Sequence, residues 1–300
     1  MGKYVDLHNH TNKSDGKYPA EKLIELAIAD DIGVFAITDH NEIMKLEEFQ
    51  ELQKKFEGKI RLVQGSELSM IYETSEGEKK EVHVVVLFKD PDRLKFLESR
   101  KMDREGYVNA IRDALAKCGI EIPTYAELKK IYPETGHLGR KHIAEWMFQN
   151  GIVDSVDAAF DIYIGGFGEK RAFVDSAPFR SSYGEMQNTV WQIRKYGMES
   201  VMAIILAHPF YYNLEERELW RLIARFKVAA GPIGGLETLY RRYDDEQRAY
   251  LAGLADRFKL FYSAGSDYHG QSETDGLDNH FPMEIWDKIE ENHRRCFEEA

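Results

Sequence analysis

Histidine and acidic residues recur at the points where short apolar runs end. Five of the ten histidines stand at or just beyond the carboxyl end of a predicted strand: His8, His10, His40, His208 and His269. Glu67 and Asp267 follow predicted strands in the same way. Parallel α/β barrels place their active sites at this end of their strands. A single strand histidine is usually a hydrogen-bonded core residue, but so many at one end favour a shared metal centre.

The spacing of these residues supports metal binding. His8 and His10 are two residues apart, and so are Asp267 and His269. In an extended chain, side chains at positions i and i+2 point to the same side, so each pair can face one centre. A sixth histidine, His83, opens another apolar run directly after a predicted turn.

The donor types indicate which metals and which chemistry to expect. Imidazole and carboxylate together suit zinc, manganese or iron(II) rather than calcium or an iron–sulfur cluster. The donors are too many for one tetrahedral ion, so we expect about two to three divalent metal ions (Mn, Fe or Zn) with bridging carboxylates. Such a cluster favours phosphate ester hydrolysis by attack of a metal-bridging hydroxide. His208 or Asp267 would then assist the leaving oxygen.

Strands and helices alternate in two parts of the chain. Apolar strand runs are predicted at 5–7, 34–38, 60–67, 82–88, 202–206, 235–240 and 260–264, and helices at 19–30, 43–56, 215–228, 244–258 and 284–298. This alternation predicts a parallel α/β sheet or barrel. Residues 91–199 carry mostly helical patterns instead. We therefore expect one barrel domain, residues 1–90 and 200–300, interrupted by a helical cap insertion, residues 91–199.

Composition limits the partners. The chain has 300 residues and a net charge of −12, which disfavours binding of long nucleic acid. A small phosphorylated substrate can still bind where metals supply positive charge. Two distant cysteines imply no disulfide framework. We see no signal-peptide pattern and no apolar stretch as long as a membrane span, so a cytoplasmic protein that binds no membrane is expected. The sequence does not predict the oligomeric state.

Several segments carry a resemblance when they are taken in order. They are Asp6-Leu7-His8-Asn9-His10-Thr11, Ser14-Asp15-Gly16, Ala36-Ile37-Thr38-Asp39-His40, Gly65-Ser66-Glu67, Val82-His83-Val84, Ala207-His208-Pro209 and Gly265-Ser266-Asp267-Tyr268-His269. As an ordered set they resemble the motifs of the PHP (polymerase and histidinol phosphatase) family. The resemblance implies a distorted (β/α)₇ barrel and a trinuclear metal site.

The resemblance also implies roles for individual residues. Nine residues would be metal ligands: His8, His10, Asp15, His40, Glu67, His83, His208, Asp267 and His269. Asp39 would orient the neighbouring His40. Together with His208 and Asp267, it completes the set of expected catalytic residues. For Asp15, the local sequence alone favours a turn residue, and only the resemblance makes it a ligand.

The insertion points to one branch of the family. Gly139-Arg140-Lys141-His142-Ile143-Ala144 resembles a stretch in the cap of PHP phosphatases for nucleoside 3′,5′-bisphosphates and of a related short-RNA exonuclease. The resemblance implies that Arg140, Lys141 and His142 bind a substrate phosphate, and Arg171 is a weaker candidate. That branch commonly carries a basic residue after His-Pro, where this chain has Phe210 and Tyr211. An aromatic pair cannot neutralise a second phosphate but could form the wall of a sugar or base pocket.

Several functions remain open at this point. The leading prediction is a metal-dependent phosphoesterase acting on a small nucleotide-like or sugar-phosphate-like ester, including a 3′,5′-bisphosphate or a cyclic phosphodiester. The alternatives are a 5′→3′ exonuclease on short oligonucleotides and a histidinol-phosphate phosphatase, against which the large cap weighs. A scaffold with a vestigial site is disfavoured because all nine ligand positions are kept. An amidohydrolase is disfavoured because we find no lysine at a strand end.

Overall fold

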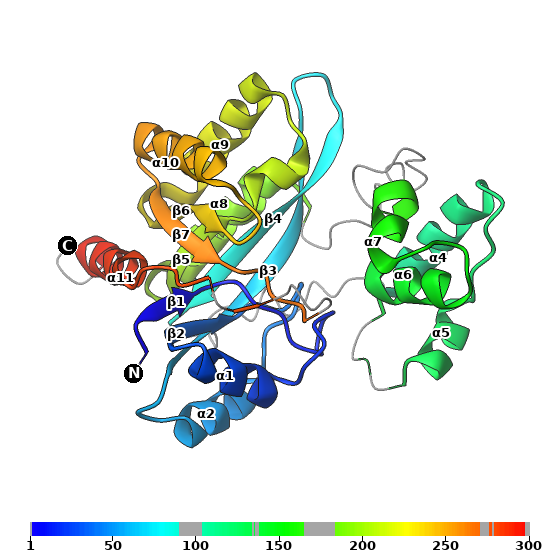
Figure 1. The fold of residues 1–300 in the computed structure, drawn as a ribbon. Coiled ribbons are helices and arrows are strands. Elements are labelled where there is room, and N and C mark those ends of the chain that lie inside the picture. The colour runs from blue at the N-terminus through cyan, green and yellow to red at the C-terminus, as the bar shows by residue number, and fades with distance from the viewer. Residues whose placement is uncertain are drawn as a thin grey trace.

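The fold is built around one seven-stranded sheet. A computed structural model describes residues 2–89, 104–133, 135, 138–164, 184–270, 276–277 and 279–297. The strands lie side by side in the order of the sequence (Figure 1). They are β1 (Tyr4–Asp6), β2 (Ile32–Ile37), β3 (Arg61–Glu73), β4 (Lys79–Phe88), β5 (Val201–Leu206), β6 (Gly234–Tyr240) and β7 (Phe261–Gly265). Each strand lies where the sequence predicts an apolar run.

Strand β4 departs from the expected parallel arrangement. The pairs β1–β2, β2–β3, β5–β6 and β6–β7 are parallel, whereas β4 is antiparallel to both β3 and β5. The expected parallel arrangement does not extend to β4, because a short turn joins β3 to β4, with Thr74 N donating to Glu78 O at 2.8 Å. A turn of this length makes a hairpin, since a parallel pair needs a long crossover connection. His83 therefore lies at the same edge as residues that follow the parallel strands.

The two edges of the sheet meet next to the predicted site. Leu7 N donates to Ala264 O at 3.0 Å, and Asp267 N donates to His8 O at 2.9 Å. A parallel bridge between Asn9 and Tyr268 continues this contact. These bonds join the chain after β1 to β7 and to the chain that follows β7, although β1 and β7 are not paired as neighbouring strands in the described sheet.

Helices cover the outside of the sheet. They are α1 (Ala20–Ala29), α2 (Leu46–Lys55), α9 (Glu216–Ala230), α10 (Asp245–Phe258) and α11 (Glu284–Phe297). Helix α1 packs on β2, α9 on β5 and β6, and α10 on β6 and β7. Strands β2 and β5 are buried along their whole length, as continuous apolar runs covered on both faces should be. No helix in the described part of the chain is long and apolar enough to cross a membrane.

The insertion forms a small helical unit with its own core. It contains α4 (Arg104–Ala116), α5 (Tyr125–Ile131), α6 (Arg140–Gln149), α7 (Val156–Ala159) and a π-helical turn (Phe160–Ile164). Buried side chains such as Ile111, Leu128 and Met147 form its core. Figure 1 shows these helices gathered on one side of the sheet.

Helix α8 (Met186–Gly197) lies in the range 91–199 but packs elsewhere. Its residues Met186, Val190 and Ile193 belong to the core of the barrel, against β3, β5 and α9. We therefore propose that the cap domain ends before α8. Three short 3₁₀ turns, Met198–Ser200, Pro209–Tyr212 and Gly231–Ile233, complete the described elements.

Candidate metal centre

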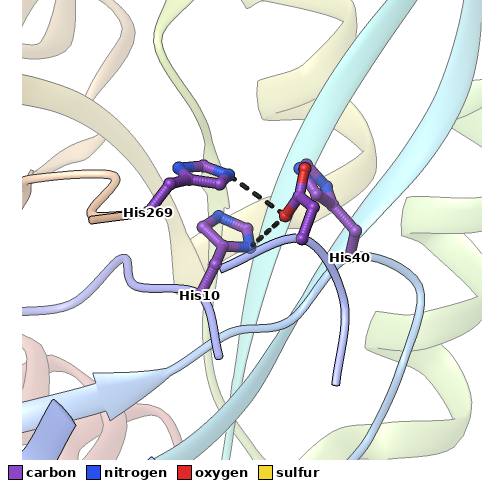
Figure 2. Close-up of side chains that lie close together, drawn as sticks. His10, His40 and His269 are labelled. Atoms are coloured by element: carbon purple, nitrogen blue, oxygen red, sulfur yellow. Dashed lines mark ion pairs between the residues drawn. The ribbon is translucent and has the colours of Figure 1, made fainter. Parts of the chain in front are cut away.

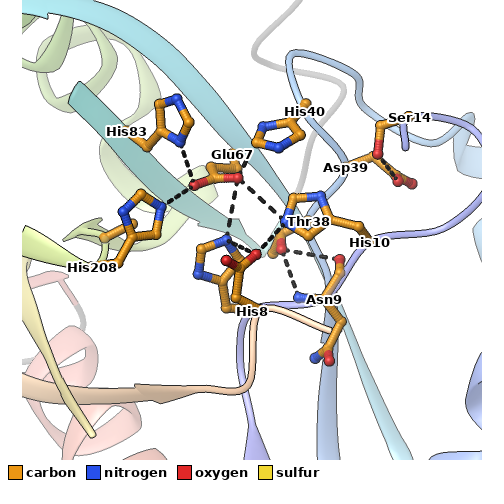
Figure 3. A network of polar contacts seen from close by, with 12 residues as sticks. His8, Asn9, His10, Ser14, Thr38, Asp39, His40, Glu67, His83 and His208 are labelled. Carbon is orange, nitrogen blue, oxygen red and sulfur yellow. Dashed lines mark hydrogen bonds and ion pairs between the residues drawn. The ribbon is translucent and has the colours of Figure 1, made fainter. Parts of the chain in front are cut away.

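A buried carboxylate from β3 lies at the middle of the site. The side chain of Glu67 is fully buried, and its two oxygens face five imidazoles (Figure 3). The distances are 2.9 Å from Oε1 to His83 Nδ1, 2.9 Å from Oε1 to His208 Nε2, 2.9 Å from Oε2 to His40 Nδ1, 3.2 Å from Oε2 to His8 Nε2 and 3.3 Å from Oε2 to His10 Nε2. One carboxylate in contact with five imidazoles is suited to bridge more than one cation.

Asp15 forms a second acidic position. Its carboxylate lies 3.2 Å from His269 Nε2, 3.7 Å from His40 Nε2 and 3.9 Å from His10 Nδ1, as Figure 2 shows for the three histidines. The loop can fold back because residue 16 is glycine, where a Cβ would lie 2.1 Å from His10 O. The structure thus brings Asp15 to the histidines.

Asp267 is the third acidic position. Its Oδ1 lies 3.1 Å from His10 Nε2 and 3.6 Å from His8 Nε2, while Oδ2 accepts a hydrogen bond from Tyr240 Oη at 2.9 Å. The backbone φ of Asp267 is +52° and that of His208 is +25°, values that side chains other than glycine rarely adopt. Such a conformation costs about 1–3 kcal/mol and persists only where the surrounding structure imposes it.

The residues fit a group of bound cations. Donor atoms of His10, Asp15, His40 and His269 lie within 4.8 Å of one another, and the same holds for two further overlapping groups around Glu67. Both ring nitrogens of His10, Nε2 of His8 and Oε2 of Glu67 are buried without a hydrogen-bond partner among the described residues. Buried polar atoms left unpaired are costly, and cations between them would satisfy them. All nine residues expected as ligands lie together here. His208 is not part of the three groups and joins them through its contact with Glu67.

Opposite charges dominate the electrostatics of the centre. Burial alone would raise the pKa of Glu67, but His40, His8 and His83 lower it well below the usual range. Burial alone would lower the pKa of His10, but the neighbouring carboxylates of Asp267 and Glu67 raise it to about 10. Burial alone would also lower the pKa of His83, but Glu67 and Glu81 raise it to about 10. Without cations, the carboxylates therefore hold protons on histidines, and bound metals would displace them.

Glu237 belongs to the site and is missed by sequence reasoning. It lies on β6, and its side chain is 1% exposed. Its Oε1 lies 3.0 Å from His8 Nδ1, and its Oε2 accepts a hydrogen bond from His208 N at 2.7 Å. A Cβ on Gly265 would lie 2.3 Å from His8 Cβ and 2.5 Å from Glu237 Oε1, so glycine leaves the room for this contact. An acidic residue within an apolar strand was the signal in the sequence.

Glu81 was also missed, because its segment reads as a polar turn. Its Oε1 lies 3.1 Å from His83 Nε2. The structure places the residue in β4, which begins at Lys79, three residues before the predicted run. Both ring nitrogens of His83 therefore face carboxylates, Glu67 on one side and Glu81 on the other.

Asp39 has a different position from the one expected. Its carboxylate accepts hydrogen bonds from Thr11 N at 2.8 Å, from Thr11 Oγ1 at 2.7 Å and from Ser14 Oγ at 2.6 Å. Both ring nitrogens of His40 face Glu67 and Asp15 instead. The expectation that Asp39 orients His40 is therefore wrong. Because the loop to which it binds carries the carboxylate of Asp15, Asp39 holds that loop in place.

The predicted cap residues reach the centre in different ways. Lys141 Nζ donates to the carbonyl of Asp15 at 2.7 Å, which ties the cap to the metal-site loop. His142 Nδ1 accepts from Gly139 N at 3.2 Å, and burial and Lys141 lower its pKa to about 4, so it is neutral and holds the start of α6. Burial alone would lower the pKa of Arg140, but Tyr107, Glu81 and Asp15 raise it. Arg171 lies outside the described residues.

The chain matches a family model over more than half of its length. A model of the PHP domain matches residues 6–176, which include six of the nine expected ligands. The chain belongs to the PHP family. A 5′-3′ exoribonuclease of Haemophilus influenzae is 32% identical over 272 residues, 90% of this chain and 91% of the relative. A 3′,5′-nucleoside bisphosphate phosphatase of Chromobacterium violaceum is 26% identical over 273 residues, 90% and 88% of the two chains.

Solved structures agree with the fold of this PHP protein. A protein of Bifidobacterium adolescentis superposes with a TM-score of 0.72 at 22% identity, covering 97% of both chains. An amidohydrolase of Chromobacterium violaceum, solved with bound sulfate and no metal, gives 0.71 at 23% identity, covering 96% of both. These likenesses show the fold. The family and its sequence relatives make the chain a hydrolase, a metal-dependent phosphoesterase.

Proposed function

We propose that this phosphoesterase hydrolyses a phosphate ester of a small nucleotide-like molecule that carries a second phosphate, such as a 3′,5′-bisphosphate. The observation that carries the proposal is the start of α6 in the cap, where Lys141 Nζ donates to Asp15 O at 2.7 Å and so places the adjacent cationic residue, Arg140, at the edge of a centre built for cations. The nine ligands would hold about two to three ions of Mn, Fe or Zn. The bisphosphate phosphatase among the relatives supports this substrate class.

The side chains around the centre have distinct tasks in this proposal. Bound divalent cations would lower the pKa of a water molecule and stabilise charge on the phosphoryl oxygens. Glu237 would keep the Nδ1 proton of His8 in place, so that Nε2 keeps a free lone pair. Arg140 would bind the second phosphate through charge-assisted hydrogen bonds.

His208 is the better of the two candidates for proton donor to the leaving oxygen. Both oxygens of Asp267 are engaged, by Tyr240 on one side and His10 on the other. Burial alone would raise the pKa of Asp267, but His269, His8 and His10 lower it well below the usual range, so it has no proton to give at neutral pH. His208 Nδ1 is buried without a hydrogen-bond partner among the described residues. Nε2 faces Glu67, so in a centre where His208 is not itself a metal ligand, Nδ1 would be the nitrogen that carries a proton to the leaving oxygen.

A second candidate function is removal of nucleotides from the 5′ end of a short oligonucleotide. The 32% identical relative named as a 5′-3′ exoribonuclease favours it. The same centre would serve, because both reactions cleave a phosphate ester next to another phosphate. The net charge of −12 restricts this activity to short chains with few phosphates.

A substrate comparison with metal analysis tests the proposal. Protein loaded with manganese would be assayed on adenosine 3′,5′-bisphosphate, a cyclic phosphate, histidinol phosphate and a 5′-phosphorylated RNA trinucleotide. We expect about two to three metals per chain and the highest kcat/KM on the bisphosphate. A higher kcat/KM on the trinucleotide would decide for the exonuclease. Fewer than one metal per chain, or no hydrolysis of any substrate by fully loaded protein, would refute both.

A further inference from the structure

The loop after β6 places an arginine at the edge of the barrel that carries the metal centre. Strand β6 runs parallel to β5 and β7, so its carboxyl end lies beside the residues that follow those strands, His208 and Asp267. Arg242 comes two residues after Tyr240, the last residue of β6.

Aromatic side chains connect Arg242 to the centre. Its Nη1 lies 3.5 Å from Tyr211 Oη, at the outer limit of a hydrogen bond. The Tyr211 ring packs edge-on against His208, with centroids 5.6 Å apart, and against Tyr240, with centroids 5.4 Å apart. The Tyr240 hydroxyl in turn donates to Asp267 Oδ2. Arg242 therefore contacts a row of aromatic side chains, Tyr211 and Tyr240, and this row in turn contacts two of the expected metal ligands, His208 and Asp267.

The guanidinium of Arg242 has donors to spare. Residue 242 is exposed, and within the described ranges it forms no ion pair with a carboxylate. A guanidinium carries five N–H donors, and the long contact to Tyr211 uses at most one of them. An anion at this position would meet the arginine and the tyrosine hydroxyl together.

Arg242 and Arg140 have different neighbours at the centre. Arg140 comes from the cap, next to Lys141, whose Nζ donates to Asp15 O, whereas Arg242 comes from the barrel and reaches the centre through Tyr211 and Tyr240. The reacting phosphate of a monoester carries one organic group, which we call an arm. A bisphosphate has its second phosphate on that one arm and so needs only one further cationic position. A phosphodiester has two arms, and an oligonucleotide carries a phosphate on each of them.

We propose that Arg242 and the Tyr211 hydroxyl form a subsite for a phosphate on the second arm of a phosphodiester substrate, while Arg140 serves the first. The subsite makes the centre able to hold a short oligonucleotide as well as a nucleoside bisphosphate. It also places a positive charge next to Phe210 and Tyr211, the two uncharged aromatic residues that follow His208-Pro209. This inference rests on the proposed phosphoesterase function and adds a determinant of its specificity.

Steady-state kinetics on two substrates tests the subsite. Arg242→Ala should raise KM for a 5′-phosphorylated adenosine trinucleotide about tenfold more than KM for adenosine 3′,5′-bisphosphate, because one charge-assisted contact is lost. kcat should change little, since the contact is made equally in the ground and transition states. Arg217→Ala removes an exposed arginine from α9 and is the matched control, with the wild-type ratio of the two KM values.

The results separate this inference from the proposed function. A rise in KM confined to the trinucleotide supports the subsite, and restoration by Tyr211→Arg in the Arg242→Ala background supports it further. Equal changes for both substrates, no change for either, or a wild-type protein that does not cleave the trinucleotide would overturn it. In each of those cases, hydrolysis of the bisphosphate by the wild type would show that the proposed function still holds.

Discussion

Replacing Glu237 by glutamine should weaken metal binding without removing any expected ligand. In the wild type, one carboxylate oxygen faces His8 Nδ1 at 3.0 Å and the other accepts from His208 N at 2.7 Å. A glutamine side chain has the same shape but only one acceptor oxygen, because its NH₂ group only donates. If the oxygen stays on His208 N, the NH₂ group faces His8 Nδ1 and selects the tautomer whose proton is on Nε2. That proton then lies on the nitrogen that faces Glu67 and Asp267.

The size of the effect follows from these alternatives. Either His8 adopts the wrong tautomer, or the amide turns and leaves the N–H of His208 against another donor. A buried unsatisfied donor costs about 1–3 kcal/mol. Loss of a side chain that orients a metal-bound histidine typically costs about tenfold to a hundredfold in metal affinity or activity. We therefore expect Glu237→Gln to lower apparent metal affinity by about one to two orders of magnitude.

Chelator competition measures this directly. The protein would be titrated with manganese against a chelator of known affinity, and metal content would be checked after dialysis. Thr238→Val is the matched control, because Thr238 is equally buried on the same strand and its hydroxyl bonds to Ser263 O rather than to the centre. Wild-type affinity and activity in Glu237→Gln would refute the reasoning. Equal losses in both variants would show a general effect on β6 instead.

Three further results are expected. His83→Ala and Asp267→Asn should each abolish hydrolysis with an unchanged near-ultraviolet circular dichroism spectrum, and an active variant with full metal content would contradict their role as ligands. Because the pKa values of His10 and His83 are about 10 without metal, cations must displace protons, so apparent affinity should rise from pH 7 toward 10 and fall on acidification. Calorimetry in two buffers should show release of about one to two protons, and none would contradict this. Arg140→Ala should raise KM for a bisphosphate about tenfold to a hundredfold, with little change in kcat or for a single-phosphate substrate.

Most of the fold could be predicted because its strands are short and strongly apolar. The runs that became β2 and β5 are buried over their whole length, and such runs are recognisable without any tertiary information. The direction of β4 was the error. The turn at Gly77 was read correctly, but a hairpin within an otherwise parallel pattern was not expected. Helix α8 was assigned to the insertion because its packing partners, β3 and α9, are distant in sequence.

The candidate site shows where local sequence stops being informative. The histidines could be found because each follows a strand, which fixes the edge at which it lies. Asp15, Asp39 and Glu237 act through a loop conformation or through neighbours on other strands, and spacing does not encode those contacts. Asp39 was therefore given the wrong partner, and Glu237 was not identified at all.

The charges of the centre explain how an acidic protein can bind phosphate. Glu67, Asp15 and Asp267 contribute three negative charges in their ionised forms, and the low pKa of each shows that this form is favoured. Two divalent cations would outweigh these three charges. Three would also outweigh the carboxylates of Glu81 and Glu237 and leave the centre positive, because the imidazoles become neutral when they bind metal. The rest of the surface carries the excess of acidic residues behind the net charge of −12 and repels long polyanions. A substrate with few phosphates therefore gains from the centre and from Arg140 or Arg242 more than it loses to the surrounding surface, whereas each added nucleotide increases the repulsion.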